Sequence, residues 1–150
     1  MGIIQDDAGN FFVYEAGKRV KKTPLSEWID NGENGHYVIK RLKNAHKVLT
    51  DSVLKKMKGA GEKYEGKPYD RYFGWSDEKI YCSELVWKIY KEGAGIEIGK
   101  LEKLSDFDLS NEIVKAKMEE RYGDHVPMDE VVISPGDMYE SNKLITVEEN

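Results

Sequence analysis

The sequence predicts an α+β fold in which a small antiparallel sheet packs against helices on one side. Three observations lead to this prediction. Short runs rich in β-branched and aromatic residues occur near both ends of the chain, turn-forming residues separate them, and segments with apolar residues at helical spacing lie between. A chain of 150 residues, 39% hydrophobic and 34% charged, is expected to form one domain over residues 1–150.

The chain is expected to open with a β-hairpin. Residues 2–5 are apolar, Asp6–Asn10 carry turn-forming side chains, and residues 11–16 are aromatic and β-branched. Residues 18–22 are expected to add a further short strand. The first part of the sheet therefore comes from the amino-terminal residues.

Two helices and a strand are predicted next. Thr23 is expected to cap a helix whose first helical residue is Pro24, and the Gly- and Asn-rich residues 31–35 end it. Residues 36–42 then predict a strand. Residues 50–64 predict a second helix, because a Thr-Asp pair caps it and apolar residues recur at helical spacing.

The second half of the chain predicts two more helices and two strands. The expected elements are, in order, a loop at residues 66–70, a helix from Cys82 to near residues 92–93, a polar linker to the capping residue Ser110, a helix over residues 112–122, and strands over residues 130–134 and 143–147.

The only cysteine, Cys82, stands at the start of its helix, ahead of an apolar stripe that includes Leu85, Val86 and Ile89. Free backbone N–H groups and the positive end of the helix dipole favour a thiolate there, and the thiolate is the nucleophilic form. Position alone also fits a second interpretation, in which Cys82 is a small core residue.

Composition excludes several classes of function. With 23 basic and 28 acidic residues the net charge is −5, so no nucleic-acid partner is expected, and residues 18–22 are interpreted as a solvated strand edge. One cysteine and scattered histidines predict no disulfide, metal site or cofactor. No apolar run is long enough for a transmembrane helix, and no signal peptide is visible, which leaves the cytoplasm as the default compartment.

A thiol hydrolase needs a thiolate, an imidazole that moves its proton, and a polar group that orients the imidazole. Cys82 supplies the first, and Glu15, beside aromatic residues on a strand, is the candidate for the third. The alternative for Glu15 is an exposed carboxylate at a strand end. No spacing selects a base among the three histidines, which are His36, His46 and His125.

Ordered blocks along nearly the whole chain resemble the circularly permuted papain-like amidases of the YiiX/YaeF group, relatives of the NlpC-type cell-wall peptidases. The matching segments are Val13–Ala16, Thr23–Leu25 with Trp28-Ile29, Gly66–Asp70, Trp75–Asp77, Tyr81–Lys88, Phe107–Asn111 and Glu120–Gly123. The resemblance implies a permuted papain-like fold and hydrolysis of amide bonds through a thioester. Peptides, amino-acid amides and lipid amides are the implied substrates.

The resemblance also implies roles for individual residues. Cys82 takes the position of the nucleophile and Glu15 that of the residue that orients the imidazole. Tyr69 and Asp70 are expected to line the cleft with Tyr81, and either the Tyr81 hydroxyl or the Cys82 backbone N–H is expected to stabilise the oxyanion.

One part of the family's pattern has no counterpart in this sequence. The family's catalytic histidine lies in a Ser-His-x-Gly motif, and aligning its glycine with Gly2 places the histidine before Met1. We therefore expect an N-terminally incomplete domain with impaired activity, and the alternative is a non-catalytic binding module of the same fold. A missing strand would expose the edge of the sheet and favour a homodimer, and a lost leader would place the protein in the cell envelope.

Overall fold

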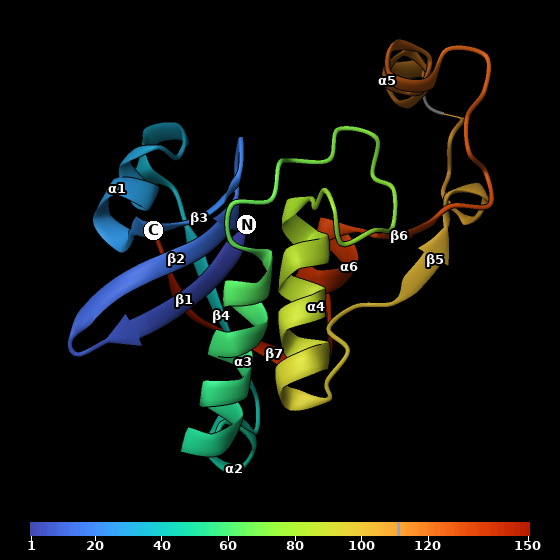
Figure 1. Ribbon diagram of the computed structural model, residues 1–150. Helices are drawn as coiled ribbons and strands as arrows, with labels where there is room; N and C mark the ends of the chain where they lie inside the picture. The colour runs from blue at the N-terminus through green and yellow to red at the C-terminus, as the bar shows by residue number, and fades with distance from the viewer. Residues whose placement is uncertain (111) are drawn as a thin grey trace.

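The computed structural model describes residues 1–110 and 112–150 (Figure 1). In chain order the elements are β1 Gly2–Asp7, β2 Asn10–Ala16, β3 Val20–Pro24, α1 Leu25–Asp30, the 3-10 turn η1 Glu33–Gly35, β4 Val38–Leu42, α2 Ala45–Val48, α3 Asp51–Tyr64, α4 Cys82–Ala94, β5 Leu101–Lys103, the 3-10 turn η2 Leu104–Asp106, α5 Glu112–Tyr122, β6 Val131–Ile133, α6 Pro135–Tyr139 and β7 Leu144–Glu149.

The strands form three small antiparallel sheets, where the sequence predicted one. β1, β2 and β3 form a sheet in that order, β4 pairs with β7, and β5 pairs with β6. Pro24 limits the first sheet at β3, because proline has no N–H to donate to a further strand. The α+β class is confirmed, with the strands arranged in separate ladders beside the helices (Figure 1).

The predicted β-hairpin is confirmed. Ala8 and Gly9 at its turn both have positive φ, 54° and 88°, which matches the right-handed twist of the two strands. The Asp6 carboxylate accepts the Gly9 N–H at 2.7 Å. β1 is an edge strand whose Ile4 is partly exposed, and pairing of two copies through this edge stays a prediction.

The first helix starts later than predicted. Thr23 lies in β3 opposite Val13, and its hydroxyl binds Glu15 and does not cap the helix. Pro24 keeps an extended backbone, so α1 begins at Leu25. Pairing with β2, together with the acceptor that Glu15 offers, therefore outweighs the local capping signal at Thr23.

The other predicted helices are confirmed, with small shifts at their ends. Thr50 caps α3 by accepting the Val53 N–H at 3.4 Å. α4 extends to Ala94, beyond the expected end, because Gly95 supplies the left-handed cap at φ 69°. Ser110, the predicted cap of α5, bonds to Asp108, and the residue after it lies outside the described part of the chain.

α3 and α4 lie side by side and form the centre of the molecule (Figure 1). Gly93 permits their close approach, because a Cβ at this position would lie 2.6 Å from the Met57 Cα. Two groups of buried side chains flank the pair. One centres on Tyr64, Leu85 and Ile89 and the other on Tyr81, Trp87 and Ile133. Ile3 of β1 packs against both, which ties the amino-terminal sheet to α4.

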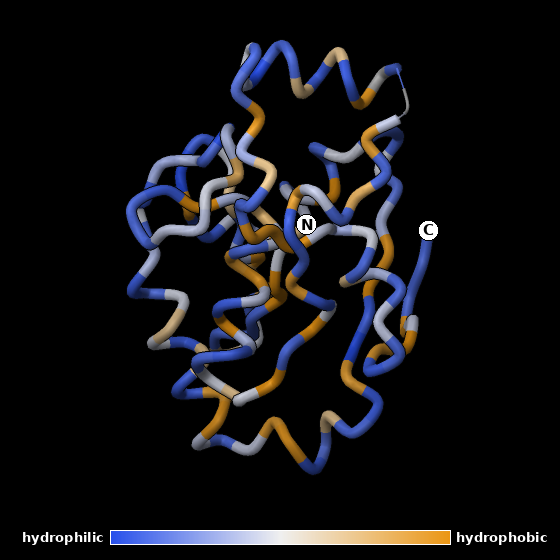
Figure 2. The backbone as a smooth tube through the Cα atoms, turned by 90° about the vertical axis from the view of Figure 1, so that its right-hand side faces the viewer, coloured by the Kyte–Doolittle hydropathy of each residue, from blue (hydrophilic) through white to orange (hydrophobic). Residues whose placement is uncertain are grey.

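α5 projects away from this centre (Figure 1), and its backbone alternates between hydrophilic and hydrophobic residues (Figure 2). Its last residue, Tyr122, attaches it to the loop after α3. The Tyr122 hydroxyl donates to the Tyr72 backbone oxygen, and the two rings lie 6.1 Å apart. Among the described helices, none combines the length and the apolar character that a bilayer span requires.

Candidate active site

Cys82 is the first residue of α4 and is partly exposed. The helix start is fixed by Glu84, whose carboxylate accepts the Tyr81 N–H at 3.3 Å. Among the described residues, the Cys82 backbone N–H has no hydrogen-bond acceptor, as expected in the first turn of a helix. The sulfur therefore lies beside an open N–H donor at the positive end of the helix dipole.

Tyr69 lies next to the cysteine because its backbone forms a parallel bridge with Ile80, two residues before α4. Burial raises the pKa of the Tyr69 hydroxyl, and the negative charge of a Cys82 thiolate beside it raises that pKa further. The hydroxyl therefore keeps its proton at neutral pH and is able to donate it to a thiolate or to an oxyanion.

Glu15 lies on β2 with its side chain held in a fixed position. Its Oε1 accepts the Thr23 hydroxyl at 2.5 Å and lies 3.8 Å from the Lys21 Nζ. Its Oε2 has no partner among the described residues, and the side chain is 19% exposed. One carboxylate oxygen is thus anchored while the other is free to accept a hydrogen bond from an imidazole.

Asp70 and Tyr81, the other predicted site residues, have structural partners. The Asp70 carboxylate is 5% exposed and accepts the N–H groups of Tyr72 and Gly74 at 2.8 and 2.9 Å. The buried Tyr81 hydroxyl accepts the Ile133 N–H at 3.1 Å, and burial raises its pKa. Asp70 shapes the loop beside Tyr69, and Tyr81 anchors the start of α4. Contact of either side chain with substrate stays a prediction.

A partly buried ion-pair network supports the same end of α4. Lys88 donates to Glu84 at 2.7 Å, to Asp77 at 2.8 Å and to the Ser76 backbone oxygen at 2.7 Å. Glu84 is fully buried, and burial raises the pKa of its carboxyl to about 7 despite the opposing effect of Lys88. This network holds the loop before Cys82 against the helix.

The three histidines lie outside this group. His36 bonds through its ring to the Asn150 backbone oxygen, and His125 follows α5. His46 is in α2, at the opposite end of α3 and α4 from Cys82 (Figure 1). Within the described residues, none of the three bonds to Cys82 or Glu15.

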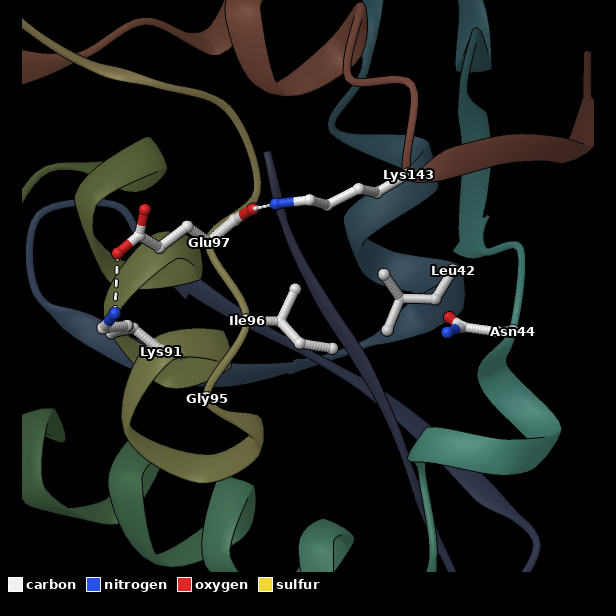
Figure 3. A pocket seen from close by; sticks show the side chains of 7 residues that line it. All are labelled: Leu42, Asn44, Lys91, Gly95, Ile96, Glu97 and Lys143. Atoms are coloured by element: carbon white, nitrogen blue, oxygen red, sulfur yellow. Dashed lines mark hydrogen bonds and ion pairs between the residues drawn. The ribbon is translucent and has the colours of Figure 1, made fainter.

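A pocket of about 430 Å³ lies at the far, carboxyl-terminal end of α4 (Figure 3). Both lysines in its lining have partners there: Lys91 contacts the Glu97 carboxylate at 2.6 Å, and Lys143 donates to the Glu97 backbone oxygen at 2.6 Å. This pocket is separate from the residues around Cys82, and no pattern in the sequence predicted it.

In this chain strands β1 and β2 come before the helix that carries the cysteine, and they pack against it. This is the circularly permuted order of a papain-like domain. Residues 1–148 match the family described as permuted papain-like amidase enzymes, YaeF/YiiX, C92 family. The chain belongs to this family.

Two similar proteins support the assignment. An uncharacterized protein, YiiX, from Escherichia coli (strain K12) is 43% identical over 136 residues, which cover 91% of this chain and 66% of the relative. The chain thus spans just under two thirds of that relative. A crystal structure from Escherichia coli O157:H7, described as that of metalloprotein YiiX, superposes with a TM-score of 0.93 and 41% identity. The superposition covers 99% of this chain and 81% of the chain in the crystal structure.

We tested whether the described residues fit a metal, because that relative is described as a metalloprotein. In the described ranges no three His, Cys, Asp or Glu side chains come together as ligands. The Asp70 carboxylate is occupied by backbone N–H groups and the Glu84 carboxylate by Lys88. The residues present therefore do not fit a resident metal ion.

Several members of the site had not been predicted from the sequence. Thr23 holds Glu15, and Lys88 holds the helix start through Glu84. The spacing of Glu84 and Lys88 at i and i+4 was a visible signal for an ion pair. The sequence did not show that this pair is buried or that it reaches the loop before Cys82.

Proposed function

We propose that this domain hydrolyses amide bonds through a thioester on Cys82. The observation that carries the proposal is a partly exposed cysteine at an open helix start, with Tyr69 positioned beside it through its backbone bridge to Ile80, in a chain of the permuted amidase family. The substrates are peptides, amino-acid amides or lipid amides.

The first step joins the Cys82 sulfur to the substrate carbonyl carbon, and the carbon–nitrogen bond breaks. The amine leaves with the proton that the thiol gives up. Water then attacks the thioester, the carboxylic acid departs, and the sulfur regains a proton. The Cys82 backbone N–H and the Tyr69 hydroxyl are the donors for the oxyanion, since the Tyr81 hydroxyl is bound to Ile133.

Amide cleavage by this route also needs a base, which Glu15 would orient through its free oxygen. No histidine among the described residues bonds to Cys82. For the chain as given we therefore propose amide hydrolysis slowed by about 10²–10⁴-fold relative to a member with a positioned imidazole. The alternative supported by the same observation is a binding module without turnover.

The test separates acylation from proton transfer. A p-nitrophenyl ester needs no protonation of its leaving group, so it should acylate wild-type Cys82 with release of p-nitrophenolate, and mass spectrometry should locate the thioester. Cys82→Ala is the matched control.

Hydrolysis of the corresponding 4-nitroanilide should be slow and should rise with added free imidazole, more in wild type than in Glu15→Gln. A Cys82 that the ester does not acylate faster than it acylates N-acetylcysteine contradicts the proposal. If Cys82→Ala also binds the anilide as tightly as wild type, and neither protein hydrolyses it, the binding module is favoured.

A further inference from the structure

Arg121 is held over the loop that carries Tyr69. Its guanidinium carbon lies 4.4 Å from the centroid of the Phe73 ring. Phe73 in turn contacts the Tyr81 ring edge-on at 5.2 Å, and Tyr81 is the residue before Cys82. Phe73 has a positive φ of 52°, a conformation unusual for an aromatic residue, and this backbone turn places its ring between the cation and the helix start.

The position of Arg121 is fixed by its neighbour in α5. Tyr122 bonds to the Tyr72 backbone oxygen and packs against the Tyr72 ring. This attachment and the stacking on Phe73 restrict the guanidinium to the surface beside the candidate site. The positive charge of Arg121 also acts on the Tyr69 hydroxyl, where it opposes the rise in pKa that burial causes.

In the described part of the chain Arg121 forms no ion pair. Burial raises the pKa of the neighbouring Tyr122 hydroxyl, and the charges of the Asp70 and Glu130 carboxylates raise it further. Both already accept backbone N–H groups of the loop over residues 72–75. The planar donors of an arginine suit a carboxylate, which binds to them in bidentate fashion.

We infer that Arg121 is a specificity-determining residue that selects amide substrates carrying a carboxylate close to the bond that Cys82 attacks. This inference rests on the proposed function, because it assigns the substrate class of the same site. Short peptides and amino-acid conjugates with a free carboxylate fit it, and their neutral carboxamides do not.

The test uses two alkylating reagents that differ in charge. Iodoacetate and iodoacetamide both form a sulfur–carbon bond with the Cys82 thiolate while the carbon–iodine bond breaks and iodide leaves. Cys82 is the only cysteine, so the label reports one site. The quantity measured is the ratio of the two rate constants, iodoacetate over iodoacetamide, in low-salt buffer at pH 7 with N-acetylcysteine as the reference thiol.

We expect the wild-type ratio to exceed the reference and Arg121→Gln to lower this ratio by about three- to tenfold. Arg121→Lys should keep most of the ratio. Arg71→Gln, which removes an exposed charge from the same loop, should change it by less than about twofold. Circular dichroism should confirm that each variant folds.

A ratio equal to that of N-acetylcysteine, or one that Arg121→Gln leaves unchanged, overturns the inference. The proposed function fails separately, when the neutral reagent reacts with Cys82 no faster than with N-acetylcysteine. The ratio remains measurable in that case, because a thiol of ordinary reactivity still alkylates slowly. The two outcomes are therefore distinguishable.

Discussion

Replacing Lys88 by methionine should destabilise the protein by an amount that grows with pH. Among the described residues Lys88 is the only cation paired with the fully buried Glu84 carboxylate, and it also bonds to Asp77 and to the Ser76 backbone oxygen. Methionine keeps most of the aliphatic packing but cannot donate a hydrogen bond. The variant therefore isolates the effect of the charge and of its three hydrogen bonds.

The magnitude follows from the state of Glu84. Its folded-state pKa, about 7, lies above the value in an unfolded chain. The folded state thus holds the extra proton at low pH, and this contribution to stability is lost as pH rises through 7. At pH 5 the carboxyl is neutral, and Lys88→Met should cost about 1–2 kcal/mol in hydrogen bonds. At pH 8.5 it leaves a buried charge unpaired, and the cost should rise to about 3–4 kcal/mol.

The assay is urea unfolding followed by tryptophan fluorescence at the two pH values. Lys91→Met on the same helix is the matched control, because it breaks only the exposed pair with Glu97 and should leave the midpoint unchanged. The double variant Glu84→Gln/Lys88→Met should recover most of the pH-dependent loss. Equal losses at pH 5 and pH 8.5, or a double variant no more stable than Lys88→Met at pH 8.5, would refute the argument that the buried carboxylate causes the loss.

Two further predictions concern packing and the loop. Gly93→Ala should lower the free energy of unfolding by about 1–3 kcal/mol, because the new Cβ meets the backbone of Met57. Gly59→Ala, where the helix surface is open, should raise the free energy of unfolding by about 0.5–1 kcal/mol. Chemical denaturation measures both changes. Equal effects of the two substitutions would contradict the close helix contact at Gly93. Asp70→Ala removes the acceptor of two backbone N–H groups, so trypsin should cut faster after the exposed Arg71. An unchanged cleavage rate would show that this carboxylate does not hold the loop.

Local signals sufficed for the main helices and for the hairpin. The apolar spacing and the Thr50 cap predicted α3, and the stripe after Cys82 predicted α4. The pairing of β4 with β7 was not predictable, because periodicity identifies a strand but not its partner. Thr23 shows the limit of capping rules: a strand neighbour and a carboxylate acceptor changed its role.

For the candidate site, the sequence predicts the cysteine as nucleophile and, through the family resemblance, Glu15 as its distant companion; both roles stay predictions. The sequence did not identify Arg121. An arginine near the end of a largely exposed helix carries no pattern of its own. Its proximity to the site depends on the left-handed backbone at Phe73 and on the attachment of Tyr122 to the loop, both of which are tertiary features.

The pairing of β4 with β7 has a consequence for synthesis on the ribosome. The first sheet is able to form once Pro24 has emerged, but β4 stays unpaired until β7 is made. At a translation rate of about 5–20 residues per second this wait lasts roughly 5–20 s. During that time Ile39 and Leu42 lack their partner strand. We expect slower translation of the segment between β4 and β7 to lower the soluble yield, although every contact in the folded protein stays the same. Pelleting stalled nascent chains measures this loss.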